Sequence, residues 1–397
     1  MQSIELFTGA GGLAMGVSRA GFHHEAVVEW NPDACETIRG NKARGVAPVA
    51  DWPLYQMDVR SFDYATLPKG IALLAGGPPC QPFSLGGRHA GYEDLRDMFP
   101  EVVRATRELQ PQAVLFENVK GLLRQSFAKY YEYILLQITY PDLVRKPTED
   151  WTDHLSRLEQ YHTKGRHDGL CYRVVFRLLN AADYGVPQRR ERVIIVGFRS
   201  DLHIEWSFPP STHSQDALLW DQYLTGQYWE RHGVMPPLLT SLPDAKRRRV
   251  DLLRSSLFPP QELPWRTVRD AIADMPTPTT TEITTTLPNH RLNPGARSYP
   301  GHTGSPIDEP AKTLKAGDHG VPGGENMLLL PDGQVRYFTV RESARLQTFP
   351  DDYVFHGSWT ESMRQLGNAV PVRLGHIVAA DIKTHLEANA RQENTVG

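Results

Sequence analysis

Six short apolar runs in residues 1–200 place the strongest constraint on how this chain can fold. They are mostly apolar and do not alternate regularly with polar residues, which is typical of strands buried on both faces of a sheet. The runs are Ile4–Phe7, Ala26–Trp30, Ile71–Leu74, Ala113–Phe116, Tyr172–Leu178 and Val193–Phe198. Segments with helical spacing, such as Met98–Leu109, lie between them. Because strand and helix alternate, we expect an α/β fold with a doubly wound, mostly parallel sheet.

The composition changes after this region. Residues 201–310 contain 15 of the 31 prolines, and such a segment cannot sustain repeated strand–helix units. Helical patterning then returns, and Pro371–Leu386 carries one apolar stripe. The polar stretch Tyr140–Asp168 is expected to be an inserted helix pair or loop. We expect a first domain, a smaller irregular domain and a C-terminal segment that returns to the first domain, at residues 1–200, 201–339 and 340–397.

Composition narrows the class of protein. The chain has 397 residues, enough to bury a large core. Its three cysteines are too few for a disulfide framework, and none of them pairs at the C-x-x-C spacing of a zinc site, so no metal is expected. No apolar run approaches the roughly 18 residues that a membrane span needs, and the first residues do not fit a secretory signal. We therefore expect a cytoplasmic protein without membrane contact.

The net charge gives a misleading first impression of the partner. The chain has 43 basic and 46 acidic residues, a formal charge of −3, which by itself argues against a nucleic-acid partner. Net charge averages over faces, however, and basic residues gather locally at Arg189–Arg192 and Lys246–Arg249. The second cluster is either a phosphate contact or an exposed helix end.

A glycine-rich turn follows the first expected strand. Gly9–Ala14 satisfies the G-x-G-x-x-G/A pattern, in which a ligand approaches the backbone at the start of a helix. Glu29 closes the second strand about 20 residues later, where a carboxylate accepts hydrogen bonds from ribose hydroxyls. The pair favours an adenosine-containing cofactor over a plain tight turn only weakly, and NAD, FAD and S-adenosylmethionine all fit. Asp58 is either a third contact or a solvated strand-end residue.

A cysteine and a carboxylate follow two further strands. Cys80 lies in Gly76-Gly77-Pro78-Pro79-Cys80-Gln81-Pro82, a loop that leaves the carboxyl end of a strand, where ligands bind in such sheets. The flanking glycines and prolines favour a nucleophile over a buried structural thiol. Glu117 ends another strand and is suited to act as a general acid on a substrate nitrogen. Arg192 directly precedes the run at 193–198 and is expected at a strand start near the sheet, against the alternative of a solvated charge run.

Taken in order, these motifs resemble those of the DNA cytosine carbon-5 methyltransferase family, of the bacterial or phage type. The similarity covers most of the chain and does not depend on one motif. The matching stretches are FTGAGG at 7–12, GGPPCQPFS at 76–84, ENV at 117–119, QRRER at 188–192, RESARLQ at 341–347 with Phe349-Pro350, and QLGNAVP at 365–371. The resemblance implies the class I S-adenosylmethionine-dependent methyltransferase fold with a smaller target-recognition domain.

The resemblance also implies a cofactor, S-adenosyl-L-methionine, and a role for each residue around it. Phe7 would stack on the adenine, Glu29 would bind the ribose, Trp30 would border the ring, and Asp58 would accept from the adenine amine. Pro78 and Asn368 would line the methionine end, and the remaining cofactor residues are those of the turn, Gly9, Gly11 and Gly12.

For the chemistry, the resemblance implies that Cys80 is the nucleophile and that Glu117 bonds the ring nitrogen and exocyclic amine of cytosine. Arg190 and Arg192 would support the site. Thiolate addition at carbon 6 activates carbon 5, and the target base must leave the stack to be reached. The base that removes the carbon-5 proton is not named by the sequence, and a water is one candidate.

The expected partner is double-stranded DNA. A mobile loop from Gln81 to about Phe99 and the Thr-Leu element of the second domain would contact it. The residues expected there are Gln81, Ser84 and Arg96 in the loop, and Thr313, Leu314 and Lys315 in the element. We expect a monomer, associated with the nucleoid, whose methylation is either orphan or part of a restriction–modification system with a functional endonuclease partner.

Three rival functions remain at this point. A tRNA cytosine-5 methyltransferase would have the same catalytic motifs but not a large DNA-reading segment. An inactive DNA-binding relative would have lost Cys80 or Glu117, and both are present. An NAD-linked oxidoreductase explains only the glycine-rich turn.

Overall fold

The computed structural model describes residues 1–79, 97–165, 169–280, 287–316 and 324–396. These residues form two compact units. The first unit comprises residues 1–179, 191–209 and 375–397, and the second unit comprises residues 180–190 and 210–374.

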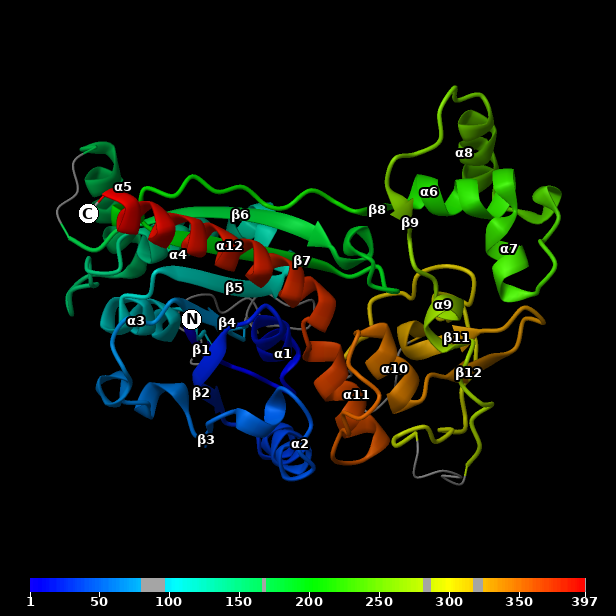
Figure 1. Cartoon of the computed structure of the whole chain (residues 1–397), viewed down its shortest axis with the longest axis horizontal. Coiled ribbons are helices and arrows are strands. Elements are labelled where there is room, and N and C mark those ends of the chain that lie inside the picture. Colours follow the sequence, from blue (N-terminus) through cyan, green and yellow to red (C-terminus); the bar gives the residue numbers. More distant parts are fainter. Residues whose placement is uncertain (80–96, 166–168, 281–286, 317–323, 397) are drawn as a thin grey trace. The chain divides into compact units, whose positions relative to one another are not determined.

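A seven-stranded sheet forms the centre of the first unit (Figure 1). Its strands are β1 (Gln2–Leu6), β2 (His23–Glu29), β3 (Leu54–Gln56), β4 (Leu73–Gly76), β5 (Ala113–Val119), β6 (Tyr172–Asn180) and β7 (Glu191–Arg199). The order is β3-β2-β1-β4-β5-β7-β6. The pairs from β3 to β5 are parallel, and β7 lies antiparallel to β5. The prediction of a mostly parallel sheet is confirmed, and each of the six apolar runs contributes a strand.

Helices pack on this sheet and bury its apolar side chains. They are α1 (Gly12–Arg19), α2 (Pro32–Ala43), α3 (Phe99–Leu109), α4 (Ala128–Thr139), α5 (Trp151–Thr163) and α12 (Val372–Val396). Ile4, Leu6 and Phe116 are fully buried in one apolar cluster with residues of α3 and α4. Figure 1 shows α12 crossing in front of the sheet. At Gly375 on α12, an added Cβ would lie 3.1 Å from the Leu13 side chain of α1.

The polar insert at 140–168 forms one helix, α5, in its described part. Asp150 caps the helix by accepting hydrogen bonds from the backbone N–H groups of Thr152 and Asp153. Leu158 is fully buried in the same apolar cluster as the sheet. The Tyr133 hydroxyl and His154 Nδ1 lie 2.8 Å apart and join α4 to α5. The insert is therefore packed onto the first unit.

The second unit has short elements separated by irregular chain, as its proline content predicts. Its helices are α6 (Gln215–Trp220), α7 (Gln227–His232), α8 (Asp244–Arg254), α9 (Val268–Ile272), α10 (Val340–Leu346) and α11 (Trp359–Asn368), and Asp221–Thr225 forms a π-helical turn after α6. Its strands are β8 (His213–Ser214), β9 (Leu263–Pro264), β10 (Ser305–Pro306), β11 (Met327–Leu329) and β12 (Val335–Tyr337). The first two pair with each other, and the last three form a small sheet.

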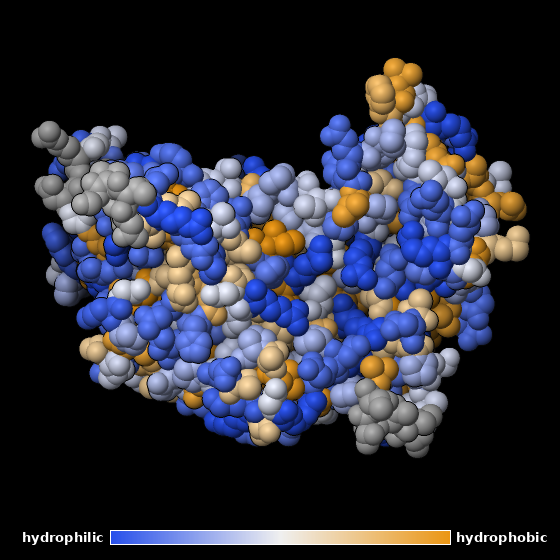
Figure 2. Space-filling view, in the orientation of Figure 1, coloured by the Kyte–Doolittle hydropathy of each residue, from blue (hydrophilic) through white to orange (hydrophobic). Residues whose placement is uncertain are grey.

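The part of the second unit around α8 presents apolar as well as charged side chains to solvent (Figure 2). The large apolar residues exposed between α7 and β9 are Met235, Leu238, Leu252, Leu257, Phe258 and Leu263. These apolar residues lie on both sides of the arginine run, so this part is less polar than that run suggests.

The division into units differs from the expected domain boundaries. Residues 201–209 stay with the first unit, where the Trp206 indole donates a hydrogen bond of 2.5 Å to Asp381 of α12. Residues 340–374 belong to the second unit, because α10 and α11 pack there and only the chain from Gly375 returns. The functional role of each part stays a prediction.

None of the helices in the described ranges is long and apolar enough to cross a membrane.

Candidate active site

The turn between β1 and α1 has the backbone geometry of a ligand-binding loop. Phe7, Gly9 and Gly11 have φ angles of +55°, +56° and +84°, and glycine adopts such left-handed angles without the strain that a side chain adds. Gly11 is the N-cap of α1, and no side chain among the residues that the structure describes caps this helix. The first backbone N–H groups of a helix have no partner within it, so this terminus suits a polar ligand.

Glu29 joins this turn to the end of β2. Its Oε2 accepts a hydrogen bond of 2.7 Å from the backbone N–H of Gly9. Its Oε1 accepts from the backbone N–H groups of Trp30 and Asn31 at 3.0 and 2.7 Å. The sequence suggested only a ribose contact for this carboxylate. The structure adds a second role, because Glu29 also fixes the two loops on which a ligand would rest.

Two further predicted cofactor residues lie at the ends of neighbouring strands. Trp30 follows β2 with 70% of its surface exposed, although it is a large aromatic residue. Asp58 follows β3 and receives hydrogen bonds from the side chain and the backbone of Arg60. These bonds hold the pKa of the Asp58 carboxyl below its ordinary value. Because β3, β2 and β1 are adjacent in the sheet, the residues after these strands share one edge of it.

The segment after β4 fits closely against its neighbours. A Cβ at Gly76 would lie 2.6 Å from the Leu6 carbonyl oxygen, so only glycine fits there. A Cβ at Gly77 would lie 3.2 Å from Glu117 Oε2. The carbonyl of the buried Pro78 accepts a hydrogen bond of 3.2 Å from the Asn118 amide. Glycine therefore leaves room for the Glu117 carboxylate, and Asn118 anchors the start of the cysteine loop.

The remaining predicted residues of this loop, Cys80, Gln81, Ser84 and Arg96, lie outside the described residues. The role of Asn118 was not predicted, although a polar residue next to Glu117 at a buried strand end was a visible signal. Asn118 is 3% exposed, and its Oδ1 also accepts a hydrogen bond from the backbone N–H of Val119.

Glu117 and Arg192 form a buried ion pair. Arg192 lies opposite Val119 in the antiparallel pairing of β5 with β7, which confirms its expected place at a strand start near the sheet. Its Nε is 2.6 Å from Glu117 Oε1, and the two side chains are 11% and 10% exposed. Burial lowers the pKa of the Arg192 guanidinium, and the Glu117 carboxylate opposes this effect. A carboxylate held in this way has a fixed position beside the start of the cysteine loop.

Arg190 is placed differently, although it is only two residues from Arg192. It belongs to the second unit and is fully buried. Its Nη1 donates to the Leu314 carbonyl at 3.1 Å, and its Nη2 donates to the Gly367 carbonyl at 2.6 Å. These bonds tie the Thr-Leu element to α11. A role of Arg190 beside the reacting base stays a prediction.

The Thr-Leu element is held by the chain around Arg190. The Thr313 hydroxyl donates to the Arg189 carbonyl at 2.7 Å, and the Leu314 N–H donates to Gln188 Oε1 at 3.0 Å. The Leu314 side chain is 1% exposed. Lys315 is exposed and forms an ion pair of 2.6 Å with Glu325. Contacts of these residues with DNA stay predictions.

The last predicted cofactor residue, Asn368, is exposed at the end of α11. The preceding Gly367 lies against the backbone of the Thr-Leu element. A Cβ there would be 2.3 Å from the Ala316 nitrogen, so no other residue fits without a shift of the backbone. The spacing between α11 and residues 315–316 is therefore set by a glycine.

The basic run at 246–249 lies in α8, and most of it is paired within the protein. Lys246 lies 3.3 Å from Glu309, and Arg247 lies 2.6 Å from Asp244. Arg249 forms an ion pair with Asp216 of α6. Lys246 and Arg249 therefore pair with acids of other segments of the second unit and Arg247 with an acid of its own helix, while Arg248 and Arg249 are exposed. A contact of this run with DNA phosphates stays a prediction.

Comparison with known proteins places this geometry in a family. The sequence profile described as C-5 cytosine-specific DNA methylase matches residues 1–139 and 152–384. The chain is 32% identical over 387 residues to the Type II methyltransferase M.NgoMIV of Neisseria gonorrhoeae, and the alignment covers 96% of each protein. It is 31% identical over 389 residues to the Type II methyltransferase M.Eco47II of Escherichia coli, covering 96% of this chain and 78% of that relative.

A solved structure supports the fold. The S. pombe Dnmt2 methyltransferase aligns with a TM-score of 0.53 and 17% identity, over 98% of this chain and 99% of that one. This likeness confirms the expected class I methyltransferase fold. With a profile match over most of its length and relatives above 30% identity, the chain belongs to the family of C-5 cytosine-specific DNA methylases.

Proposed function

We propose that this protein is a site-specific DNA (cytosine-5)-methyltransferase that acts through a covalent adduct between Cys80 and the target cytosine. The observation that carries this is the ion pair of Glu117 with Arg192, 2.6 Å apart and buried, next to the segment that leads into Cys80. Family membership supports the same reaction. The names of the relatives, Type II methyltransferases, favour a place in a restriction–modification system.

The family and the fold imply the use of S-adenosylmethionine. The residues at the edge formed by β1, β2 and β3 fit it: a glycine turn, an uncapped helix start, a strand-end carboxylate and an exposed indole. Glu29 would hold the ribose, Trp30 and Phe7 the adenine ring, and Asp58 its amine. Gly9, Gly11 and Gly12 would let the ligand approach the backbone, and Pro78 and Asn368 would line the methionine end. When bound, this cofactor supplies an electrophilic methyl group on a sulfonium centre.

The chain's own residues make cytosine carbon 5 nucleophilic. The Cys80 thiolate adds to carbon 6, and the electron pair of the ring double bond moves toward the ring nitrogen. Glu117 hydrogen-bonds or protonates that nitrogen, which stabilises the developing charge, and Arg192 holds the carboxylate in place. After methylation, loss of the carbon-5 proton to a base and departure of the thiolate restore the ring.

The reacting atoms lie inside the stack of duplex DNA, so the target cytosine must be extruded at a cost of a few kcal/mol. Contacts from the cysteine loop, with Gln81, Ser84 and Arg96, and from Thr313, Leu314 and Lys315 would recover this cost and read the sequence. We infer a monomer that acts on double-stranded DNA in the cytoplasm, near the nucleoid, with an endonuclease as a functional partner only.

A trapped adduct tests the mechanism. Duplex DNA with 5-fluorocytosine at the target blocks loss of the group on carbon 5, so the wild-type protein should form a complex that survives denaturation. Cys80→Ala should form none, while Cys171→Ala, a matched change at a free thiol, should behave as wild type. A persistent adduct with Cys80→Ala would reject the assignment.

The substrate is tested by bisulfite sequencing of DNA from cells that express the protein, which reports activity and recognition sequence together. Methyl transfer to tRNA but not to duplex DNA would favour the rival tRNA enzyme. Sequence-specific DNA binding without any transfer would favour the inactive relative.

A further inference from the structure

One group of helices in the second unit has no role in the function proposed above. We call it the helical module and define it as residues 213–264, which include β8, α6, α7, α8 and β9. Its contacts with the rest of the unit include α9 and an apolar cluster with Ala182 and Trp265. Several of its polar contacts meet at two neighbouring acids, Asp308 and Glu309, which precede the Thr-Leu element in the chain.

Two buried polar residues of the module bind Asp308. The Gln222 amide donates a hydrogen bond of 2.8 Å to the Asp308 carbonyl. The Tyr228 hydroxyl donates to Asp308 Oδ1, also at 2.8 Å. Tyr228 is fully buried, and burial together with the Asp308 charge raises the pKa of its hydroxyl, which therefore stays a donor. The module thus fixes both the backbone and the side chain of Asp308.

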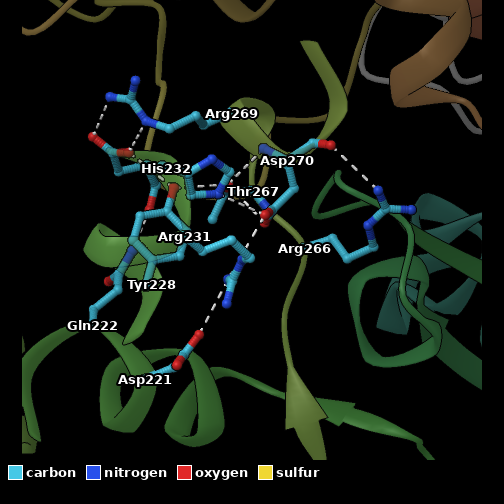
Figure 3. Close-up of polar contacts among 10 residues, drawn as sticks. Asp221, Gln222, Tyr228, Arg231, His232, Arg266, Thr267, Arg269 and Asp270 are labelled. Atoms are coloured by element: carbon cyan, nitrogen blue, oxygen red, sulfur yellow. Dashed lines mark hydrogen bonds and ion pairs between the residues drawn. The ribbon is translucent and has the colours of Figure 1, made fainter. Parts of the chain in front are cut away.

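Helix α9 binds the same residue from another direction. Arg269 contacts both carboxylate oxygens of Asp308, at 2.6 and 3.1 Å. The backbone N–H of Arg269 also donates to the Ile307 carbonyl at 2.8 Å. Figure 3 shows α7 and α9 joined by side chains, with Tyr228 next to Thr267 at 2.9 Å between hydroxyls.

A second link joins the same two helices and completes this network. His232 and Arg231 of α7 lie 2.8 and 3.8 Å from Asp270 of α9, and Arg231 also lies 3.2 Å from Asp221 within the module (Figure 3). Asp270 is itself fixed, because it forms a capping box with Thr267 at the start of α9. The module is therefore attached to α9 by groups that are already held, which makes it a firm support for Asp308.

Glu309 connects the module to the chain around Arg190. Lys246 of α8 and Arg189 each lie 3.3 Å from the Glu309 carboxylate. The Lys246 ammonium also lies 5.4 Å from the centre of the Tyr223 ring, within the range of a cation–π contact. The Arg189 N–H donates to the Ala311 carbonyl at 2.8 Å. From here the Thr-Leu element is held by the residues that surround Arg190.

We propose that the helical module is a positioning element for target recognition, with Lys246 and Tyr228 as its positioning residues. By fixing Asp308 and Glu309, it sets where the Thr-Leu element begins. This inference rests on the proposed function, in which residues 313–315 take part in reading DNA. In this proposal, the basic run on α8 forms ion pairs with acids of the protein and does not bind DNA phosphates.

The test measures kcat/KM for methyl transfer to two DNA duplexes, one with the recognition sequence and one in which a single base pair of that sequence is changed. The ratio of the two kcat/KM values is then compared between the variants and the wild type. Lys246→Gln and Tyr228→Phe should lower this ratio about threefold to tenfold, since one charge-assisted hydrogen bond corresponds to about a factor of ten. The kcat on the correct sequence should stay near wild type, because neither residue touches the reacting atoms. Arg248→Gln is the matched control, an exposed cation on the same helix, and should leave the ratio unchanged.

Conservative variants separate positioning from folding. Lys246→Arg keeps the charge beside Glu309 and should restore the ratio, and Tyr228→Phe keeps the buried ring, so both should fold. Unchanged discrimination in Lys246→Gln and Tyr228→Phe would overturn the proposal. Equal loss of DNA affinity in Arg248→Gln and Lys246→Gln would overturn it in favour of phosphate contacts. Absence of methyl transfer by the wild-type protein would instead reject the proposed function.

Discussion

The two units hold their polar residues by different physical means. In the first unit, Glu29 and Glu117 lie on strands of the sheet, and backbone pairing with neighbouring strands sets their positions. In the second unit, residues 307–314 run without a long strand or helix, and side chains from four other segments hold their backbone and acids.

This difference follows from the need of every buried backbone group for a hydrogen-bond partner. A sheet supplies partners collectively, and its apolar faces add about 1.5–3 kcal/mol for each large side chain buried. An irregular segment has no such ladder, so arginine and glutamine side chains must supply the partners one by one. We therefore expect single polar substitutions to affect the second unit more than the first.

The largest expected effect is at Arg341 of α10. This fully buried guanidinium donates to the carbonyls of Pro288, Pro350 and Tyr353 at 2.9, 3.0 and 2.6 Å. Arg341→Leu should lower the free energy of unfolding by about 4 kcal/mol, because a buried polar group without a partner costs about 1–3 kcal/mol. Urea unfolding followed by tryptophan fluorescence measures the change.

The matched control in the first unit is Arg104 of α3, which also donates to two carbonyls, those of Val59 and Phe62. Its side chain is 22% exposed, so water can replace it. Arg104→Leu should cost only about 1 kcal/mol. Equal losses of unfolding free energy in Arg341→Leu and Arg104→Leu would contradict the distinction between the two units.

Low pH is expected to lower the free energy of unfolding through one buried histidine in each unit, so this effect does not distinguish the two units. In the first unit, burial lowers the pKa of His24 from 6.5 to about 4. In the second unit, burial and the charges of Arg373 and Arg266 lower the pKa of His213 to about 4. Below pH 6.5 the unfolded chain binds protons at these histidines that the folded chain does not bind until about pH 4.

The unfolding free energy should therefore fall as the pH drops through this window, by about 3 kcal/mol for His24 at 1.36 kcal/mol per pKa unit. Urea titrations from about pH 7 to about pH 4 measure it. In His24→Gln, the fall should be smaller by this contribution. A slope identical to that of the wild type would show that His24 does not contribute.

The smallest expected effect is that of Glu29→Ala, which tests whether the first unit binds the cofactor. Glu29→Ala should weaken cofactor binding at least tenfold, as expected for loss of a hydrogen bond to a charged group, while DNA affinity stays nearly intact. Calorimetry with S-adenosylmethionine and a DNA-binding assay measure the two affinities. Asp63→Ala is the control, because this carboxylate also accepts a hydrogen bond from a backbone N–H group of this unit but lies outside the predicted site. Equal loss of both affinities would mean that Glu29 is structural only.

The contrast between backbone pairing in the first unit and side-chain partners in the second unit also explains what the sequence could predict. Apolar runs identify six of the seven strands of the sheet. The short strand β3, which Asp58 follows, is not among these runs, so only the fold shows that Glu29 and Asp58 share an edge. Arg190 and Arg192 look alike in sequence, yet one lies on β7 beside Glu117 and the other precedes the strand and binds carbonyls of the second unit. Only the fold distinguishes the positions of these two arginines, because the partner of each lies more than 70 residues away in the chain.

The basic run of α8 shows the same limit. Charge counts alone do not tell whether Lys246 meets DNA or Glu309, since the partner is supplied by a segment 63 positions further along the chain. Prolines predict that the region is irregular, but irregular chain has no periodicity from which side-chain partners follow.

The chain crosses between the units after residues 179, 190, 209 and 374, so neither unit is one continuous stretch. The second unit is therefore not a cassette that can be exchanged in one piece between relatives. A chimera that replaces residues 210–374 alone keeps the host's Gln188 and Arg190, which then face a foreign backbone in place of Leu314 and Gly367. Exchange of residues 180–190 together with 210–374 keeps these partners from the same parent.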